Sequence, residues 1–97
     1  MRRAAKIDAN QADMVAKLRT RKVLVLSLAA LGGGVPDLLC GYDGRLVLLE
    51  VKDGSKVPSA RKLTSFQESF HKEWAGFPLF VVESVEQALN ALGVPDV

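Results

Sequence analysis

Two acidic residues and a lysine, Asp37, Glu50 and Lys52, interrupt a stretch that otherwise consists of leucine, valine and turn glycines. The dipeptide Asp43-Gly44 between them favours a two-residue hairpin turn, and in the resulting register Asp37 lies directly opposite Glu50. Like charges placed in this way repel each other. Lys52 lies on the same face as Glu50, because side chains alternate along a strand. The pattern therefore concentrates three charged groups on one face of a predicted sheet.

Such a cluster needs something that offsets the repulsion between the carboxylates. One acid can be protonated, Lys52 can bridge the pair in a purely structural cluster, or a divalent metal ion can bind between them. Two carboxylates with a strand carbonyl between them form a hard-oxygen site that suits Mg²⁺ or Mn²⁺, ions that also bind phosphate oxygens. A lysine beside the metal can orient or deprotonate an attacking water and stabilise charge on the phosphorane. The third possibility, a metal ion bound between the two carboxylates, would give a site that hydrolyses phosphodiesters.

Length and composition indicate one small soluble domain. The chain has 97 residues, of which 48% are hydrophobic and 25% charged, enough for a single core. The basic start "MRRAAK" is followed by polar residues, so we expect no secretion signal, and the longest apolar run, "VLVLSLAAL", is too short to cross a membrane. We therefore expect a cytosolic protein with no membrane partner. A single cysteine, Cys40, and a single histidine, His71, exclude an intramolecular disulfide and a zinc site built on Cys and His, so a metal must be held by oxygen.

The net charge of +2 conceals a segregated pattern. Residues 1–22 and 54–72 are basic, whereas residues 23–53 and 73–97 are acidic. Two basic segments around an acidic middle suit a polyanion that is held at its phosphates beside a cation site, although solvated chain ends would give the same pattern. The predicted phosphate contacts are Arg19, Arg21, Lys22, Lys56, Arg61 and Lys62. Because contacts of this kind do not read bases, we expect structure-selective or weakly selective binding.

The elements that must position these residues predict an α/β fold of order α-β-β-β-α-β-α, with a mixed four-stranded sheet flanked by helices. Helices are expected at about 9–20, 65–75 and 84–93, and strands at 22–30, 36–42, 45–53 and 78–82. The first strand is continuously apolar, as expected of a strand covered on both faces. The crossover before the last strand is long enough to make that strand parallel to the third. Phe66, Phe70 and Trp74 recur at helical spacing and are expected in the core.

Two short segments, "PD" at 36–37 and "EVK" at 50–52, look like the PD-(D/E)xK nuclease motif. The longer stretch "GGGVPDLLCGYDGRLVLLEVKDG", followed by "LTSFQ", resembles the VRR-NUC family of small phage and bacterial nucleases, which shares features with Holliday junction resolvases. The resemblance covers about residues 8–92 of a single domain, 1–97. It implies a compact restriction-endonuclease-like core that cuts DNA with Mg²⁺ or Mn²⁺, in a bacterial cell or a phage-infected host.

The resemblance also implies roles for individual residues. Asp37 and Glu50 would be metal ligands, with the Val51 carbonyl as a third ligand. Lys52 would be the catalytic lysine. Gln67 falls where the family has a motif glutamine beside the active site, although its position also fits a helix capping box. Both roles stay open for Gln67.

The chain departs from the family pattern in its first helix and before "GVPD". Related nucleases often carry a glutamate on the first helix, where this chain offers Asp13, or else Gln11, which also fits as the capping-box partner of Asp8. The glycines at 32–34 stand where relatives often have an arginine, and they either let backbone approach a phosphate or form a loose turn. His71, one helical turn beyond the motif glutamine, is expected to be a surface or packing residue.

The resulting hypothesis is a metal-dependent DNA endonuclease that acts on branched or nicked DNA in replication and repair. Since one small site cuts one strand, symmetric cutting of two strands would need a two-fold homodimer. An RNA nuclease or a non-selective DNA nickase on the same fold is an alternative. A second alternative is a non-catalytic nucleic-acid-binding module, in which Asp37, Glu50 and Lys52 serve structure.

Overall fold

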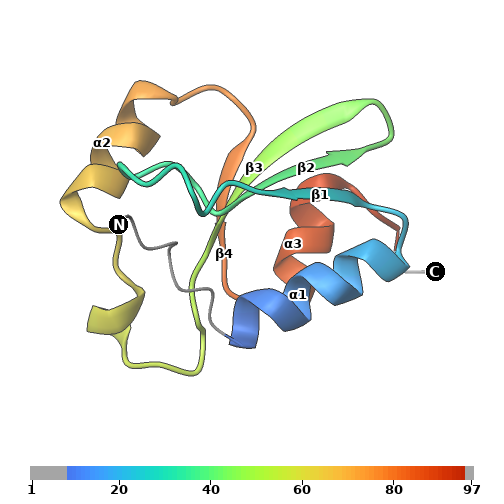
Figure 1. Ribbon diagram of the computed structural model, residues 1–97, viewed down its shortest axis with the longest axis horizontal. Coiled ribbons are helices and arrows are strands. Elements are labelled where there is room, and N and C mark those ends of the chain that lie inside the picture. The colour runs from blue at the N-terminus through green and yellow to red at the C-terminus, as the bar shows by residue number, and fades with distance from the viewer. Residues whose placement is uncertain (1–8, 96–97) are drawn as a thin grey trace.

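The computed structural model describes residues 9–95 and has the predicted α/β architecture (Figure 1). In chain order the elements are α1 (Ala9–Thr20), β1 (Leu24–Ser27), β2 (Leu38–Tyr42), β3 (Arg45–Val51), the 3-10 helix η1 (Pro58–Arg61), α2 (Ser65–Glu73), β4 (Leu79–Val82) and α3 (Val85–Leu92). The order α-β-β-β-α-β-α is confirmed, and η1 is an additional turn in the loop after β3. Within the described residues, none of the helices has the length and apolar character needed to cross a bilayer.

The strands form one mixed sheet in the order β1-β2-β3-β4. β1 pairs with β2, and β2 with β3, in the antiparallel sense. β4 runs parallel to β3, as the length of the crossover predicted. The two edges of the sheet are therefore β1 and β4.

The hairpin between β2 and β3 has the predicted register. Both turn residues, 43–44, have positive φ, as a type I′ turn requires. At the other end of the hairpin Leu38 pairs with Leu49. Asp37 and Glu50 are the next residues along these two strands, so the tight turn carries the two acids to the same end of the sheet.

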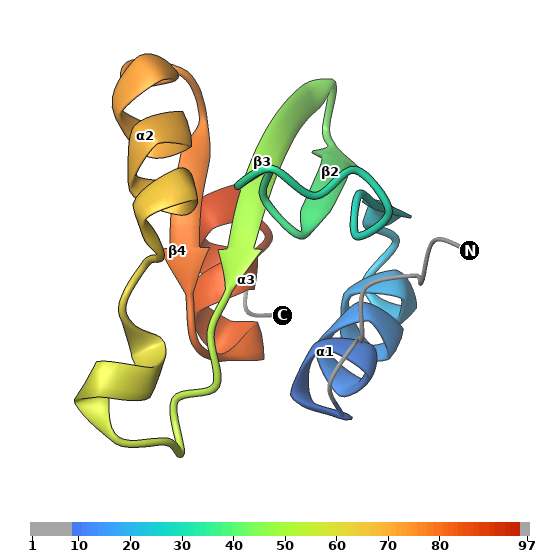
Figure 2. The same cartoon turned by 60° about the vertical axis from the view of Figure 1, so that its left-hand side comes forward.

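The core lies between the sheet and two helices. α1 and α3 contact each other and pack against the same face of the sheet, while α2 lies apart from them beside β4 (Figures 1 and 2). The buried hydrophobic side chains are Met14, Leu18, Val23, Leu38, Cys40, Val47, Leu49, Val82, Ala88, Leu92 and Val94. Cys40 is one of these buried residues, and burial raises the pKa of its thiol to about 11.

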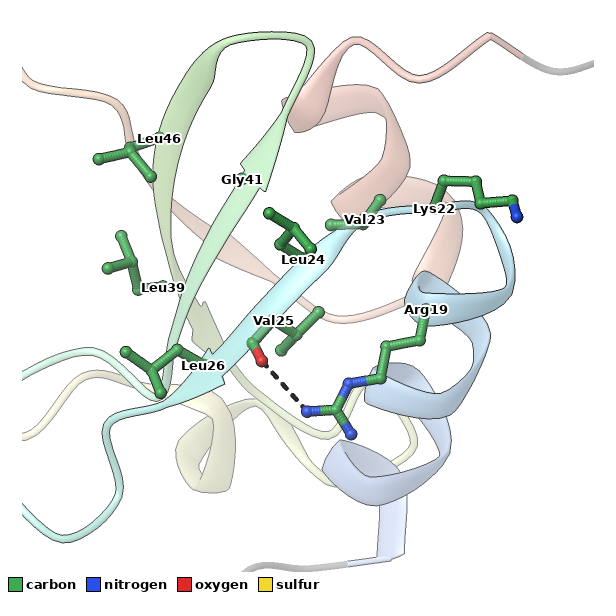
Figure 3. Close-up of a pocket in the computed structure, with 9 residues that line it drawn as sticks. All are labelled: Arg19, Lys22, Val23, Leu24, Val25, Leu26, Leu39, Gly41 and Leu46. Atoms are coloured by element: carbon green, nitrogen blue, oxygen red, sulfur yellow. Dashed lines mark hydrogen bonds between the residues drawn. The ribbon is translucent and has the colours of Figure 1, made fainter.

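The predicted burial of the first strand on both faces is wrong. β1 is a short edge strand, and Leu24 and Leu26 are 76% and 58% exposed. Together with the exposed Leu46 of β3 they line an open hollow of about 630 Å³ on the sheet face opposite α1 and α3 (Figure 3). The apolar run predicted a strand correctly, but its composition alone did not say whether a helix would cover both sides.

The predicted core position of the α2 aromatic residues is also wrong. All of α2 lies within the described residues, and none of its side chains is buried. Phe66 is 71% exposed. Phe70 stacks on Trp74 with ring centroids 5.1 Å apart, and Trp74 contacts Phe77 at 5.6 Å. The helical spacing correctly placed the aromatic side chains on one side of the helix, but that side packs mainly on itself.

Helix caps follow the sequence where they can be assessed. Asp8, the predicted N-cap of α1, lies outside the described residues. Thr64 and Gln67 form a complete capping box at the start of α2. Ser84 caps α3 by accepting a hydrogen bond from the Gln87 amide, and α3 ends at the left-handed Gly93.

Candidate active site

The two acids at the open end of the hairpin interact closely. Asp37 Oδ2 accepts a hydrogen bond of 2.7 Å from the Val51 amide, which fixes this carboxylate beside the end of β3. The Asp37 carbonyl in turn accepts from the Leu28 amide at 2.8 Å. Glu50 is only 1% exposed. Burial chiefly, and then the hydrogen bond and charge of Asp37, raise the pKa of Glu50 to about 8, while the charge of Lys52 opposes the shift.

Gln67 connects the helix, the lysine and the acid. Its Oε1 atom accepts hydrogen bonds from Lys52 Nζ at 2.8 Å and from the Thr64 amide at 2.9 Å. Its Nε2 atom donates to Glu50 Oε2 at 3.2 Å. The two interpretations of Gln67 are therefore compatible, because one side chain both caps α2 and orients two groups of the acidic cluster.

His71 is a member of this cluster that the sequence interpretation assigned to a surface or packing position. Its Nε2 atom lies 3.6 Å from Glu50 Oε1, and its side chain is 17% exposed. Burial, followed by the charge of Lys52, lowers the pKa of His71. The available signal was its spacing, because residues four apart on a helix lie on one side of it and Gln67 already pointed to the site.

A cleft of about 210 Å³ opens beside the acids, at the meeting point of α1, α2 and the glycine-containing loop. Asp37, Gln67 and Gln11 line it, and Gln11 is 7% exposed. Asp13 lies on the outer side of α1, is 60% exposed and forms an ion pair of 3.0 Å with Lys17. Of the two candidates on the first helix, the structure therefore brings Gln11 to the cleft and leaves Asp13 on the surface.

The glycines at 32–34 allow the loop to reach α2. All of them have positive φ. A Cβ atom on Gly34 would overlap the backbone carbonyl of Phe66, whereas a Cβ on Gly32 or Gly33 would meet nothing within 4 Å. Gly34 is therefore the position at which the backbone of the loop packs directly against the first turn of α2, next to Gln67.

We expect Gly34→Ala to lower the free energy of unfolding by about 1 to 3 kcal/mol more than Gly33→Ala does. Both variants place a side chain at positive φ, so the strain is matched, but only the first collides with α2. Urea unfolding of the two variants measures the difference. Equal costs would contradict the close approach of this loop to Phe66.

The first group of predicted phosphate contacts lies away from the acids. Lys22 lines a hollow with the hairpin turn, 43–44, whereas Asp37 is at the other end of β2, a five-residue strand that spans about 17 Å. Arg19 donates to the Val25 carbonyl at 3.1 Å (Figure 3), and Arg21 donates to the Pro95 carbonyl. The structure does not bring these three side chains to the acidic cluster.

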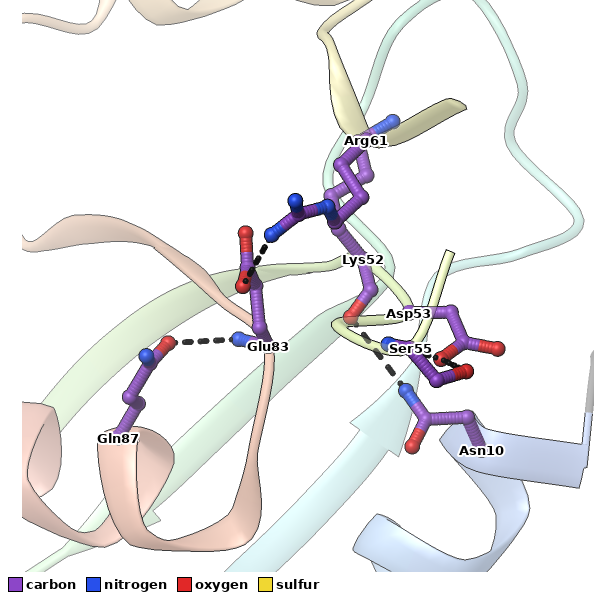
Figure 4. A network of polar contacts seen from close by, with 7 residues as sticks. All are labelled: Asn10, Lys52, Asp53, Ser55, Arg61, Glu83 and Gln87. Atoms are coloured by element: carbon purple, nitrogen blue, oxygen red, sulfur yellow. Dashed lines mark hydrogen bonds and ion pairs between the residues drawn. The ribbon is translucent and has the colours of Figure 1, made fainter. Parts of the chain in front are cut away.

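The second basic group follows the motif lysine along the chain. Lys56 and Lys62 are exposed on either side of η1. Arg61 forms an ion pair of 3.1 Å with Glu83, which directly follows β4 at the end of the sheet where β3 also ends (Figure 4). This group is therefore at the same end of the sheet as the acids, although Glu83 already neutralises Arg61.

The donor atoms suit a hard cation in part. In residues 9–95 no group of three or more His, Cys, Asp or Glu side chains is arranged to hold an ion. Two carboxylates nevertheless converge from Asp37 and Glu50, and Glu50 Oε1 is buried without a hydrogen-bond partner among the described residues. A buried oxygen that lacks a partner is costly unless another group satisfies it. The residues therefore fit a cation such as Mg²⁺ or Mn²⁺, which keeps several water ligands and needs few from the protein.

The fold and the cluster thus define a small α/β domain with an acid-acid-lysine group at the open end of a hairpin. In comparisons with protein-family models, curated proteins and solved structures, none matched this chain.

Proposed function

We propose that this protein is a metal-dependent DNA endonuclease of the VRR-NUC type, within the PD-(D/E)xK nucleases. The observation that carries the proposal is the arrangement at the end of β3, where Asp37 and Glu50 converge and Gln67 holds Lys52 Nζ at 2.8 Å. A structural cluster would use its lysine to neutralise the acids. Here the ammonium group donates a hydrogen bond to a neutral amide oxygen instead, and Glu50 Oε1 is left without a hydrogen-bond partner within residues 9–95.

Asp37, Glu50 and the Val51 carbonyl would hold Mg²⁺ or Mn²⁺. When bound, the ion would supply concentrated positive charge next to a phosphate oxygen of the DNA. The Val51 amide orients Asp37 through its 2.7 Å hydrogen bond, and Gln67 orients Glu50. These bonds hold both carboxylates in place before the substrate arrives, which reduces the reorganisation needed for the reaction.

Lys52 acts on the reacting groups directly in this proposal. An ammonium group has three donors, and Gln67 Oε1 accepts only one of them. The remaining donors can hold the attacking water and neutralise negative charge as the water oxygen bonds to phosphorus and the P–O bond to the leaving oxygen breaks. Gln67 is then a positioning residue for Lys52.

The substrate proposed is branched or duplex DNA. Lys56 and Lys62 are exposed at the same end of the sheet as the acids and are suited to phosphates on either side of the cut. Arg19, Arg21 and Lys22 lie at the other end and would contact DNA only at a distance from it. The distance between these two basic groups favours a substrate with more than one duplex arm, as in a four-way junction.

We also propose that the protein acts as a homodimer. One site cuts one strand, so paired cuts in a junction need two copies related by a two-fold axis. The exposed face with Leu24, Leu26 and Leu46 offers apolar surface that association would bury.

The function is tested by cleavage of linear, forked and four-way DNA of matched length and sequence, with Mg²⁺ or Mn²⁺. We expect the wild-type protein to cut, with a preference for the branched substrates. Asp37→Asn should lower the cleavage rate at least about 100-fold, because it removes a ligand charge. Asp13→Asn, which changes an exposed carboxylate on α1, is the matched control and should leave the rate unchanged.

Each arm of that experiment has an outcome against the proposal. A wild-type protein that binds DNA but cuts nothing with Mn²⁺ would favour the non-catalytic binding module. Equal cutting of all three substrates would remove the preference for branched DNA. Cutting of RNA in preference to DNA would assign the same chemistry to an RNA nuclease.

A further inference from the structure

Two buried polar atoms face each other across the boundary between β3 and α2. Glu50 Oε1 and His71 Nε2 are 3.6 Å apart, and neither has a hydrogen-bond partner within residues 9–95. Glu50 is 1% exposed, so water does not solvate its carboxyl group freely. A separation of 3.6 Å is too long for a hydrogen bond between them. Leaving two such buried atoms unpaired is costly, so this pair needs a third group that satisfies both of them.

Neighbouring groups fix the orientation of the Glu50 and His71 side chains. Glu50 Oε2 accepts from Gln67 Nε2, which turns the other carboxylate oxygen toward His71. Gln67 is itself held by hydrogen bonds from Lys52 Nζ and the Thr64 amide. Because Gln67 and His71 are one helical turn apart, the helix that fixes the first residue also fixes the second. The gap between Glu50 and His71 is therefore a consequence of the packing of α2.

The charge states do not make this contact an ion pair. The pKa of Glu50 is raised and that of His71 is lowered, in both cases chiefly by burial. Lys52, the other charged group close by, opposes the protonation of His71.

We propose that His71 Nε2 joins Glu50 Oε1 as a ligand of the divalent ion that Asp37 and Glu50 would hold, and that the imidazole makes this site prefer Mn²⁺ to Mg²⁺. Two ligand atoms on one ion, each about 2.0 to 2.2 Å from it, lie about 2.8 to 3.6 Å apart at octahedral to tetrahedral angles. The observed 3.6 Å is at the upper end of that range. Imidazole nitrogen is a ligand that transition metals accept and that Mg²⁺ disfavours.

Two hollows beside α2 differ in their lining residues. His71 lines one of about 520 Å³, together with Glu68 and Lys72. Gln67, by contrast, lines the cleft that contains Asp37. The inference deepens the proposed function, on which it rests for its effect on DNA cleavage, but the binding of the ion is measurable without any DNA.

The test is the spectrum of Mn²⁺ bound to the full-length wild-type protein at pH 8. Pulsed electron paramagnetic resonance should detect coupling of the ion to one imidazole nitrogen. His71→Ala should abolish this coupling and lower the affinity for Mn²⁺ about 10-fold or more, as measured by titration. The affinity of His71→Ala for Mg²⁺ should differ from that of the wild-type protein by less than about 2-fold. Ser69→Ala, on the same helix, is the matched control and should keep the coupling and both affinities.

The alternative is that a proton on Glu50 satisfies His71 and no ion binds there. In that case wild-type protein with Mn²⁺ shows no nitrogen coupling, and this result overturns the inference whether or not the variants fold. His71→Asn provides a second variant that keeps a polar side chain, and wild-type affinity for Mn²⁺ in it would overturn the inference as well. Nitrogen coupling in a protein that cuts no DNA would instead refute the proposed function alone. DNA cleavage without nitrogen coupling would refute the inference alone.

Discussion

Lys52→Ala is expected to lower the rate of DNA cleavage by about 10²- to 10⁴-fold, the range associated with a positioned proton donor or charge-stabilising group. Lys52 Nζ is held 2.8 Å from Gln67 Oε1, so the ammonium group occupies a defined place beside the two acids. The change leaves Asp37 and Glu50 intact, and the protein should still bind Mn²⁺. Single-turnover cleavage at saturating protein concentration measures the effect, because it removes any loss of DNA affinity from the comparison.

The control for this variant is Lys72→Ala, which removes an exposed ammonium group from α2 and should leave the single-turnover rate unchanged. The cleavage rate of Gln67→Ala should lie between those of Lys52→Ala and Lys72→Ala. We expect a loss of about 10- to 100-fold, because the change releases Lys52 without removing it. A Lys52→Ala protein that cuts at the wild-type rate would exclude the lysine from the chemistry and would favour the structural cluster.

Glu50→Gln is expected to stabilise the protein above neutral pH when no metal is present. The pKa of Glu50 is raised from 4.5 to about 8, so the folded state binds its proton more tightly than the unfolded state does. This contribution to stability is complete below about pH 4.5 and is lost as pH rises toward 8. Glutamine has a similar shape and does not ionise. The stability of the variant relative to wild type should therefore grow with pH, by up to about 1.4 kcal/mol per unit.

Thermal unfolding in the presence of EDTA at pH 5 and pH 8 measures this difference, since about 1 kcal/mol shifts the Tm of a domain of this size by about 4 to 8 °C. Glu86→Gln, at an exposed carboxylate in the first turn of α3, is the control and should show no growing difference. Mn²⁺ should raise the Tm of wild type at pH 8 and have little effect on Glu50→Gln. Parallel pH profiles for wild type and Glu50→Gln would contradict the burial of an ionisable group at this position.

The most reliable predictions from sequence concerned groups that lie close together along the chain. The turn at 43–44 sets the register of the β2–β3 hairpin, and this register carries Asp37 to Glu50. The caps at Thr64 and Ser84 follow from hydrogen bonds that span three residues. In each case the responsible interaction acts within a few residues, so tertiary packing has little opportunity to change it.

The predictions that failed concerned which surfaces would be covered. The apolar first strand and the aromatic side of α2 have the composition of buried elements, yet Leu24 is 76% and Phe66 71% exposed. Hydrophobic periodicity identifies the side of an element that can be buried, but burial also requires an opposite surface. With α1 and α3 both on one face, the described part of the chain has only α2 on the other, and the contacts of its Gln67 and His71 are with Glu50 of β3 rather than with β1.

The sequence by itself determined the order of the elements, the hairpin and the meeting of Asp37, Glu50 and Lys52 at one end of it. Only the tertiary structure decided that Gln11 rather than Asp13 lines the cleft, and that His71 faces Glu50 at 3.6 Å. The reason is physical. A strand register depends on neighbouring residues and a period of two, whereas these last contacts depend on how whole helices are placed against the sheet by residues far away in the chain.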